Sequence, residues 1–495
     1  MKLKYIILFS FLSLFSCDDF LDKSPLDKVT EESFYETDGD FIRATNAIYS
    51  TLQEYWRFTL DGYVTPNGYC NSSWRDADID AYSGVISSVW NNNYNTIAYA
   101  NIVLEEIEGK DITDDIKERC IGEAAFLRAF AYFELAMYFG DVPLITELQK
   151  SVSEYHVEKS TQAEILAQVL SDLNTAEQNL PSVTTYRGTD DLGRVALETA
   201  KMLKVRYYMW QHDYENAANK AYEIIEANNY QLLDDYHEQF WLGGDNTNES
   251  IFEVQYQAGI GEGSAFNNYM APAGSGYTWR GGYGPLEVSA SLVNEFEIND
   301  NIVPDPESTD PYQTYDARLR WTALYQGTPY SPEMFEGIEY QGAWAQNTSY
   351  STVKYILGKN GTEINDSPKN MILMRYADLL LMYAEALNEI GAGDQYAAAK
   401  YVNMVRQRAT VNLPPISDSI SQDEMRDAIK HERRTELGME GVYYFDLLRW
   451  GDYLSAMDEE YPGKGWASAS KFLLWPIPQD ELDKNPNLTQ NPDYM

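Results

Sequence analysis

The stretch GEAAFLRAFAYFELAMYFGDVPLI, residues 122–145, decides how the rest of the chain folds. Its helical part carries only three charges, on Glu123, Arg128 and Glu134, and its apolar side chains point in every direction of a helical wheel. A helix that is apolar all round is buried. The three charges argue against a membrane span, and the sequence Gly-Asp-Val-Pro then ends the helix. We therefore predict that this stretch is the central helix of a large soluble core.

The charges on the central helix need partners on other helices, because an unpaired buried ion is costly. Two later stretches carry suitable side chains: RYADLLLMYAEALNE, residues 375–389, and HERRTEL, residues 431–437. We expect these two stretches to supply the partners and most of the charges to pair across helices. The residues concerned are Arg128, Glu134, Asp378, Glu385, Arg433 and Arg434.

The same three stretches resemble signature blocks of the SusD/RagB family, the cell-surface glycan-binding lipoproteins of Bacteroidetes. The third block continues as EGVYYFDLLRW, residues 440–450, and both ends of the chain match as well. These ends are CDDFLDKSPLDKVTEESFY, residues 17–35, and LLWPIPQDELDKNPNLTQNPDY, residues 473–494. The resemblance covers nearly the whole chain. It implies a helical-repeat scaffold, an oligosaccharide ligand, no cofactor, and a SusC-like TonB-dependent β-barrel transporter as partner.

The composition excludes several classes of function. With 495 residues, of which 44% are hydrophobic, the chain can bury a core in one large domain or two. It carries 37 basic and 77 acidic residues, so its formal charge is −40. Such a chain repels phosphate backbones and anionic membranes. We therefore expect no nucleic-acid partner.

Residues 1–16 have the pattern of an export signal: two lysines, a short apolar run, and a serine before Cys17. Cleavage by ordinary signal peptidase is one interpretation. The sequence Leu-Phe-Ser-Cys is, however, similar to a bacterial lipobox, and the following Asp18 and Asp19 resemble a surface-export signal. We therefore predict a lipoprotein signal peptide, lipidation of Cys17, and a place on the outer face of the outer membrane.

Two further cysteines remain. Cys120 adjoins the central helix and is expected to be an inert core thiol. Its separation from Cys70 says nothing about geometry, so a disulfide between the two stays open.

Helical periodicity continues through most of the chain. Apolar stripes at helical spacing occur in residues 41–55, 90–104 and 166–180. Residues 195–227 and 375–408 each consist of an Ala-rich helix, a break and a second Ala-rich helix, and both resemble the 34-residue tetratricopeptide pattern. The fold is therefore predicted to be mainly α: a tetratricopeptide-like helical-repeat scaffold with a loop-rich insertion that contains short β-hairpins.

The predicted insertion differs from the helical parts in residue composition and periodicity. Residues 56–83 and 241–370 lose helical periodicity and fill with Gly, Asn, Pro, Tyr and Trp. Short strands are expected at 251–255 and 353–357. We predict one SusD-like domain, residues 17–495, made of an N-terminal helical part (17–240), the insertion (241–370) and a C-terminal helical part (371–495).

The motifs of most enzyme classes are absent. The four histidines form no HExxH pattern, and no CxxC, GxxxxGK[ST] or GxSxG motif occurs. We expect no metal, no cofactor and no catalytic residue. His431 could be a general base, but the charged residues around it favour a structural role. Two alternatives stay open: a glycoside hydrolase, because the many acidic residues could include a catalytic pair, and a helical-repeat module whose grooves bind peptide.

Flat aromatic side chains beside polar donors mark the predicted ligand site. A pyranose has an apolar C–H face and a rim of hydroxyl groups, which suits a Trp or Tyr face with an amide or guanidinium at its edge. Three irregular segments offer such pairs. The predicted glycan-binding residues are Trp74, Arg75, Trp279, Arg280, Tyr283, Trp344 and Asn347. The tryptophans assigned to the core instead are Trp90, Trp210, Trp321, Trp450 and Trp475.

Overall fold

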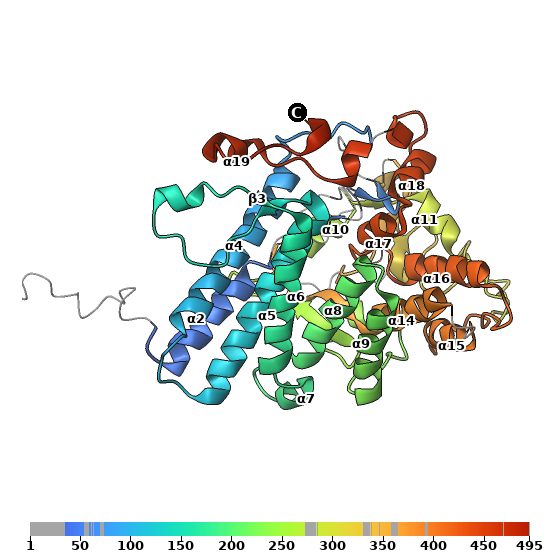
Figure 1. Ribbon diagram of the computed structural model, residues 1–495. Coiled ribbons are helices and arrows are strands. Elements are labelled where there is room, and N and C mark those ends of the chain that lie inside the picture. Colours follow the sequence, from blue (N-terminus) through green and yellow to red (C-terminus); the bar gives the residue numbers. More distant parts are fainter. Residues whose placement is uncertain are drawn as a thin grey trace, which may run out of the picture.

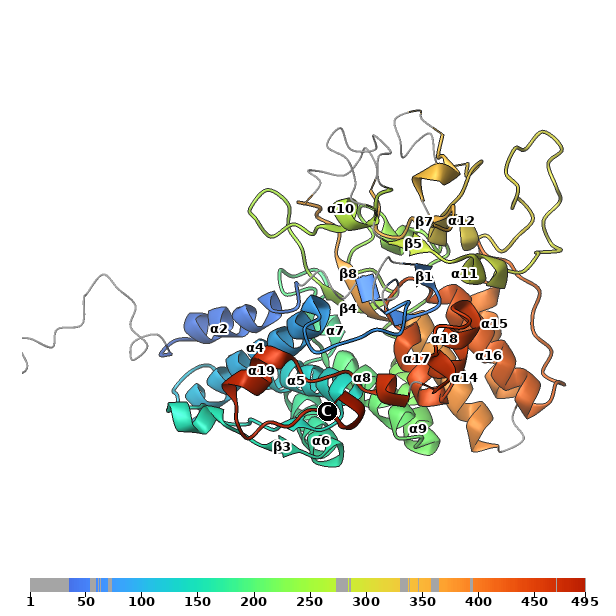
Figure 2. The ribbon, with the colours of Figure 1, turned by 90° about the horizontal axis from the view of Figure 1, so that it is seen from above.

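The molecule has two layers, one of helices and one of irregular chain with short strands. The computed structural model describes residues 35–53, 59–60, 62, 64–69, 74–272, 284, 286–329, 337, 339–345, 347–357, 365–391, 395–468 and 470–494. In Figure 2 the long helices lie together in the lower part, and the irregular chain around α10, α12, β5 and β7 lies above them. We call this upper part the loop layer.

Helices that follow one another along the chain also lie side by side. The longer ones are α2 (Asp38–Ser50), α4 (Gly84–Glu106), α5 (Asp114–Phe139), α6 (Gln162–Asn179), α8 (Leu197–Trp210), α9 (Tyr214–Ala227), α14 (Tyr376–Ile390), α15 (Gln395–Arg406), α16 (Gln422–Glu436), α17 (Tyr443–Trp450) and α18 (Tyr453–Glu460). Figure 1 shows α2 to α9 and then α14 arranged across the molecule, each packed on its neighbour. Shorter helices are α7 (Val183–Tyr186), α10 (Phe266–Met270), α11 (Ala290–Glu295), α12 (Leu319–Thr322) and α19 (Gln479–Lys484).

Helix α5 is the predicted central helix. Every residue from Gly122 to Phe139 is buried, as the all-round apolar pattern requires. The helix ends at Gly140, whose φ of +71° is a conformation that favours glycine. Gly122 allows α5 to approach the end of α6, because a Cβ at this position would lie only 2.8 Å from the side chain of Leu180. The prediction for this stretch is confirmed.

The two tetratricopeptide-like segments fold as predicted. Helices α8 and α9 form one antiparallel pair, and α14 and α15 form the other. Helix α9 packs against α14 although the insertion separates them in sequence. The scaffold is therefore one continuous row of helices from which the insertion projects. The three predicted apolar stripes correspond to α2, α4 and α6, whose buried residues face this core. Helix α2 ends at Ser50, and Tyr55 of the first stripe lies outside the described residues.

The buried charges of α5 find their partners nearer by than expected. Arg128 donates from Nη2 and Nε to the two carboxylate oxygens of Asp172 on α6, at 2.6 and 2.8 Å. Glu123 pairs with Arg119 on its own helix and with Arg194. The expectation that residues 375–389 and 431–437 supply these partners is thus wrong for Arg128 and Glu123. Helix α6 packs along α5 and so places Asp172 beside Arg128.

Charges in the two later stretches do pair across helices. Arg433 on α16 contacts Asp378 on α14 at 2.9 Å and Asp446 on α17 at 2.8 Å. Glu385 of α14 pairs with Arg449 of α17 through both carboxylate oxygens. These contacts tie α14, α16 and α17 into one unit.

The strands are short, and their partners lie far apart in sequence. They are β1 (Gly68–Tyr69), β2 (Val142–Pro143), β3 (Lys159–Ser160), β4 (Ser250–Val254), β5 (Glu287–Val288), β6 (Ala323–Leu324), β7 (Ser351–Thr352) and β8 (Met371–Arg375). β4 pairs with β8 antiparallel, so the insertion leaves and rejoins the scaffold at one place. β1, β5, β7 and β6 form a small sheet in that order. The predicted strand at 251–255 is present, whereas that at 353–357 is wrong: β7 ends at Thr352, and Tyr355 has a φ of +66° that no strand residue adopts.

Cys120 is a buried free thiol, as predicted. Because Cys120 is free, it forms no disulfide. Cys17 and the predicted signal peptide lie outside the described residues, so the lipid anchor stays a prediction. Within the described part of the chain, no helix has the length and apolar character needed to cross a bilayer.

Candidate functional site

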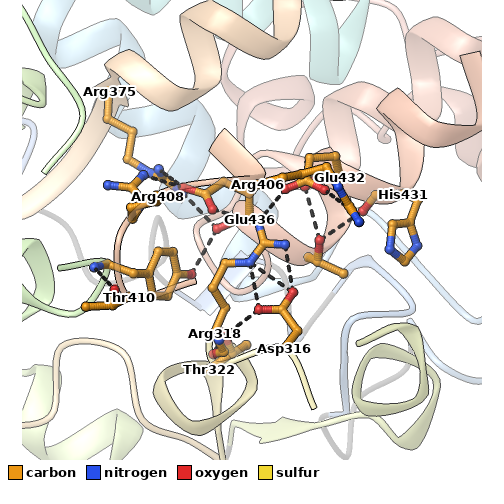
Figure 3. A network of polar contacts seen from close by, with 12 residues as sticks. Asp316, Arg318, Thr322, Arg375, Arg406, Arg408, Thr410, His431, Glu432 and Glu436 are labelled. Atoms are coloured by element: carbon orange, nitrogen blue, oxygen red, sulfur yellow. Dashed lines mark hydrogen bonds and ion pairs between the residues drawn. The ribbon is translucent and has the colours of Figure 1, made fainter. Parts of the chain in front are cut away.

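A group of closely paired charged side chains forms a network beneath the loop layer. Figure 3 shows Arg318, Arg375 and Arg408 directed at Glu436 of α16. Arg375 Nη1 lies 2.6 Å from Glu436 Oε1, and Arg318 Nη1 lies 2.6 Å from Glu432 Oε1. The network joins Arg318 just before α12, Arg375 at the end of β8, Arg408 just after α15, and two glutamates in the C-terminal half of α16. It therefore brings two of the family-like sequence blocks together.

This network is closed to solvent. Arg318 and Glu436 have no exposed surface and Arg375 exposes 1%. Burial alone would raise the pKa of Glu436, but the charges of Arg375, Arg408 and Arg318 hold it well below the ordinary range. A set of paired ions without access to a ligand stabilises the fold rather than forming a site.

His431 lies at the edge of the same helix. Its Nδ1 is 2.9 Å from Glu295 Oε1, and its Nε2 is 3.8 Å from Glu297 Oε1. Burial would lower the pKa of His431, but the hydrogen bonds to the two carboxylates raise it to about 9. The ring is thus protonated at neutral pH and both nitrogens face carboxylates, which suits the predicted structural role better than that of a general base.

The small sheet in the loop layer brings together three strands that neighbour the predicted ligand-binding segments in the sequence. β1 lies just before Trp74, β5 follows the segment that contains Trp279, and β7 follows the segment that contains Trp344. Tyr69 pairs with Glu287, and Glu287 pairs with Ser351 across the sheet. Main-chain hydrogen bonds therefore hold these distant parts of the sequence side by side (Figure 2).

Trp74 is not an exposed stacking residue, and its assignment to the ligand site is wrong. Its side chain is 2% exposed. Its ring packs against that of Trp475, with ring centroids 5.0 Å apart. The C-terminal segment covers the indole. The residues next to Trp74 in the sequence do not indicate that contact.

Arg75 remains a candidate ligand-binding residue, and its contacts add Tyr69 as a second candidate. Its side chain is 24% exposed and forms a salt bridge of 2.8 Å with Asp76. One Nη donates to the hydroxyl of Tyr69, and the guanidinium carbon lies 5.4 Å from the centre of the Tyr69 ring. Tyr69 is partly exposed on β1 and was not predicted, although its place in an irregular, Gly-rich segment was a usable signal.

Asn347 is held in place by Glu287 of β5. The Asn347 side chain donates from Nδ2 to Glu287 Oε1 at 3.0 Å, and its main-chain N–H donates to Oε2 at 3.0 Å. Thr348 donates to the same Oε2 from its main chain at 2.9 Å and from its hydroxyl at 3.1 Å. Glu287 itself was not predicted. It fixes an exposed amide at the surface of the sheet.

Trp344 is partly exposed and is oriented by a buried tyrosine. It ends the short 3₁₀ helix Gly342–Trp344, and its ring meets that of Tyr340 edge to face at 5.4 Å. The hydroxyl of Tyr340 lies 3.0 Å from the hydroxyl of Ser351 on β7. The indole is thereby fixed beside the sheet. Trp279, Arg280 and Tyr283 lie outside the described residues and stay predictions.

The core tryptophans divide into two groups. Trp90 and Trp475 are buried, as predicted. Trp210, Trp321 and Trp450 keep part of their surface exposed, so their assignment to the core is only partly right. Two of them are the last residues of α8 and α17, where a side chain reaches the edge of the helical layer. Across the described residues, no three His, Cys, Asp or Glu side chains are grouped as metal ligands.

Comparisons with known proteins agree with the architecture. The SusD family model matches residues 248–494, and a second model, described as starch-binding associating with outer membrane, matches residues 19–190. SusD-like protein P25 of Formosa agariphila is 26% identical over 99% of this chain and 98% of its own length.

Solved structures show the same fold. A SusD-like carbohydrate-binding protein from Bacteroides fragilis has a TM-score of 0.79 and 25% identity, covering 92% of this chain and 100% of that one. A laminarin-binding SusD-like protein has a TM-score of 0.74 and 25% identity, covering 93% and 100%. With its helical-repeat scaffold, its small sheet and these matches along nearly its whole length, the chain belongs to the SusD family.

Proposed function

We propose that this protein captures oligosaccharides at the cell surface and passes them to a SusC-like TonB-dependent transporter in the outer membrane. The observation that carries the proposal is the small sheet, which gathers a partly exposed indole and polar side chains from segments far apart in sequence. Family membership points to the same ligand class, since the matching relatives include carbohydrate-binding and laminarin-binding proteins.

The chemistry of these side chains suits a sugar. The face of Trp344 covers roughly 50 to 60 Å² of a pyranose, which at about 25 cal/mol/Å² contributes on the order of 1.5 kcal/mol. The amide of Asn347 and the guanidinium of Arg75 then bind hydroxyl groups at the rim. Two or three such stacks, less the cost of ordering the ligand, correspond to micromolar to millimolar dissociation constants. Weak binding of this kind favours capture and release over storage.

The proposed site comprises described and undescribed residues. Of the glycan-binding residues predicted from the sequence, the proposed site keeps Arg75, Trp344 and Asn347. It also includes Tyr69, and Glu287 positions Asn347. Trp279, Arg280 and Tyr283 are proposed to complete the platform, because their segment leads directly into β5.

Calorimetric titration tests the ligand class. The probes are laminarihexaose, which represents a laminarin, and maltoheptaose, which represents starch. We expect a millimolar or tighter dissociation constant for at least one of them. A flat titration with both, and with a panel of other neutral hexasaccharides, would overturn the proposal of glycan capture.

We further propose that binding occurs without hydrolysis. Glu287 is the carboxylate nearest to the candidate amide, and four hydrogen bonds from Asn347 and Thr348 occupy its oxygens. A general acid must instead hold a proton toward the glycosidic oxygen. Prolonged incubation with the same oligosaccharides should yield no new reducing ends, and their appearance would favour the hydrolase alternative.

The anchor and the partner are proposed from the sequence and the family. Replacing Cys17 by Ala should abolish acylation and move the protein out of the membrane fraction, which labelled palmitate and fractionation would measure. Affinity-tagged protein extracted in mild detergent should bring a large β-barrel with it. Repeated purification of the protein alone from its native membrane would contradict transfer to a transporter.

A further inference from the structure

A separate groove lies in the helical layer, among α6, α8 and α17. Its volume is about 440 Å³. Residues at the start of α6, at the end of α8 and just after it, and at the end of α17 line it. This volume lies within the range of roughly 300 to 1,000 Å³ that is typical of small-molecule sites.

Part of the groove lining is apolar and includes a flat aromatic ring. Trp210, the last residue of α8, lines it together with Leu166 of α6 and Leu448 of α17. Trp210 is partly exposed, in contrast to the fully buried Trp475. An indole that borders an open groove offers the apolar surface on which a pyranose ring stacks.

The rim of the groove is polar. Gln211 and His212, which join α8 to α9, are exposed there. His212 Nδ1 lies 3.2 Å from the hydroxyl of Tyr214, which orients the ring and leaves Nε2 for a ligand. An amide and an imidazole next to an indole can donate to and accept from sugar hydroxyl groups.

The one full charge at the rim is neutralised. Arg449 donates from Nη2 to Glu385 Oε2 at 2.7 Å and to Asp446 Oδ1 at 2.9 Å. Its guanidinium is therefore committed to two carboxylates and does not attract an anion into the groove. The formal charge of −40 on the whole chain opposes anionic ligands further.

We propose that this groove is a second binding site, specific for a neutral mono- or disaccharide. The indole takes the sugar face, and Gln211 and His212 bind its hydroxyl groups. A volume of about 440 Å³ suits a short sugar rather than a segment in the middle of a long chain. The proposal rests on the proposed function only for the class of ligand, and it uses none of the residues of the small sheet.

The choice of variants follows from a second cavity. Trp210 also lines an internal cavity of about 80 Å³, together with Phe130 and Met137. Removing the indole would enlarge this cavity and destabilise the core. The informative changes are therefore Gln211→Ala and His212→Gly, because both residues are exposed and glycine accepts the φ of +55° found at His212.

The test uses laminaribiose and maltose as probes, observed by saturation-transfer NMR and by calorimetry on the full chain. It is carried out in a Trp344→Ala background, which weakens the site at the small sheet. We expect one of the disaccharides to bind this variant, and the added Gln211→Ala and His212→Gly changes to weaken that binding about tenfold. Glu215→Ala, an exposed change in the first turn of α9, is the matched control and should leave binding unchanged.

The outcomes separate this inference from the proposed function. Undiminished disaccharide binding in the Gln211→Ala, His212→Gly variant would overturn the groove alone. Absence of disaccharide binding in the Trp344→Ala background, with hexasaccharide binding intact in the wild type, would also overturn the groove and leave the sheet site standing. Loss of all saccharide binding on the groove changes, with no effect of Trp344→Ala, would support the groove and overturn the sheet site.

Discussion

The buried network around Glu436 and the candidate site on the small sheet are both rich in polar side chains, yet they are built in opposite ways. In the network, arginines and carboxylates from distant segments are fully paired and hidden from solvent. On the sheet, the backbone joins the segments, and the side chains of Arg75, Trp344 and Asn347 keep exposed surface. The family-like sequence blocks contribute to the network. They therefore identify the scaffold, whereas the proposed sugar site lies in the loop layer.

The largest effect expected from this comparison is on stability. Glu436→Gln removes one charge that faces three arginines, and breaking a buried ion set in this way costs about 4 kcal/mol. The free energy of unfolding, measured with urea, should fall by that amount. The same substitution at the exposed Glu118 of α5 is the control and should change it by less than about 0.5 kcal/mol. Equal effects at the two sites would contradict the structural role of the network.

Trp74 and Trp344 offer a sharper comparison, because both lie in aromatic, irregular segments. Trp74→Ala leaves a cavity beside Trp475 and should lower the free energy of unfolding by about 3 kcal/mol. The folded fraction should keep wild-type affinity for the oligosaccharide. If Trp74→Ala had an unchanged melting temperature but a weaker affinity for the oligosaccharide, Trp74 would have to be assigned to the ligand site after all.

Trp344→Ala should have the reverse effect. Losing one stacking face weakens oligosaccharide binding by on the order of 1.5 kcal/mol, or about tenfold, while the melting temperature stays unchanged. Calorimetric titration measures the first and differential scanning calorimetry the second. Tyr82→Ala, at a tyrosine that is 77% exposed outside the sheet, is the control and should affect neither. Wild-type affinity in Trp344→Ala would place the site elsewhere.

The smallest expected effect is on the pH dependence of the free energy of unfolding. Because the pKa of His431 is raised to about 9 in the folded protein, its ion pairs with Glu295 and Glu297 contribute fully below the unfolded pKa of about 6.5. That contribution is lost as pH rises through about 9. The ring is partly exposed, so the loss between pH 6.5 and 9.5 should be only about 1 kcal/mol. In His431→Gln the unfolding free energy should lack this fall, and an unchanged pH profile in that variant would assign the effect to another group.

Local patterns in the sequence were enough to predict the helical layer. The burial of α5 follows from its apolar residues alone, and the α8–α9 and α14–α15 pairs follow from their spacing and breaks. Partners that depend on how helices pack could not be predicted in this way. Asp172 meets Arg128 because α6 lies along α5, and no local signal distinguishes it from many other acidic residues.

The candidate site was only partly predictable for the same reason. Residue type and the composition of the irregular segments predicted Trp344, Asn347 and Arg75 as ligand-binding residues. All three side chains are at least partly exposed in the structure. The same criteria pointed to Trp74, whose burial depends on a segment at the far end of the chain. Glu287 was missed because its role arises from strand pairing across more than one segment, whereas Tyr69 lies in an irregular segment that could have indicated it.

The pairing of β4 with β8 bears on how such a protein can acquire a new ligand. Val254 and Met371 face each other across these neighbouring strands, so the two ends of the insertion meet. A segment whose ends lie together can be exchanged as a single cassette without moving the parts on either side. Recombination between related genes could thus replace residues 255–370 in one event, provided that Arg318, which pairs with Glu432 and Glu436 of α16, is kept. Grafting residues 255–370 from a relative with another sugar preference would reproduce that step in the laboratory.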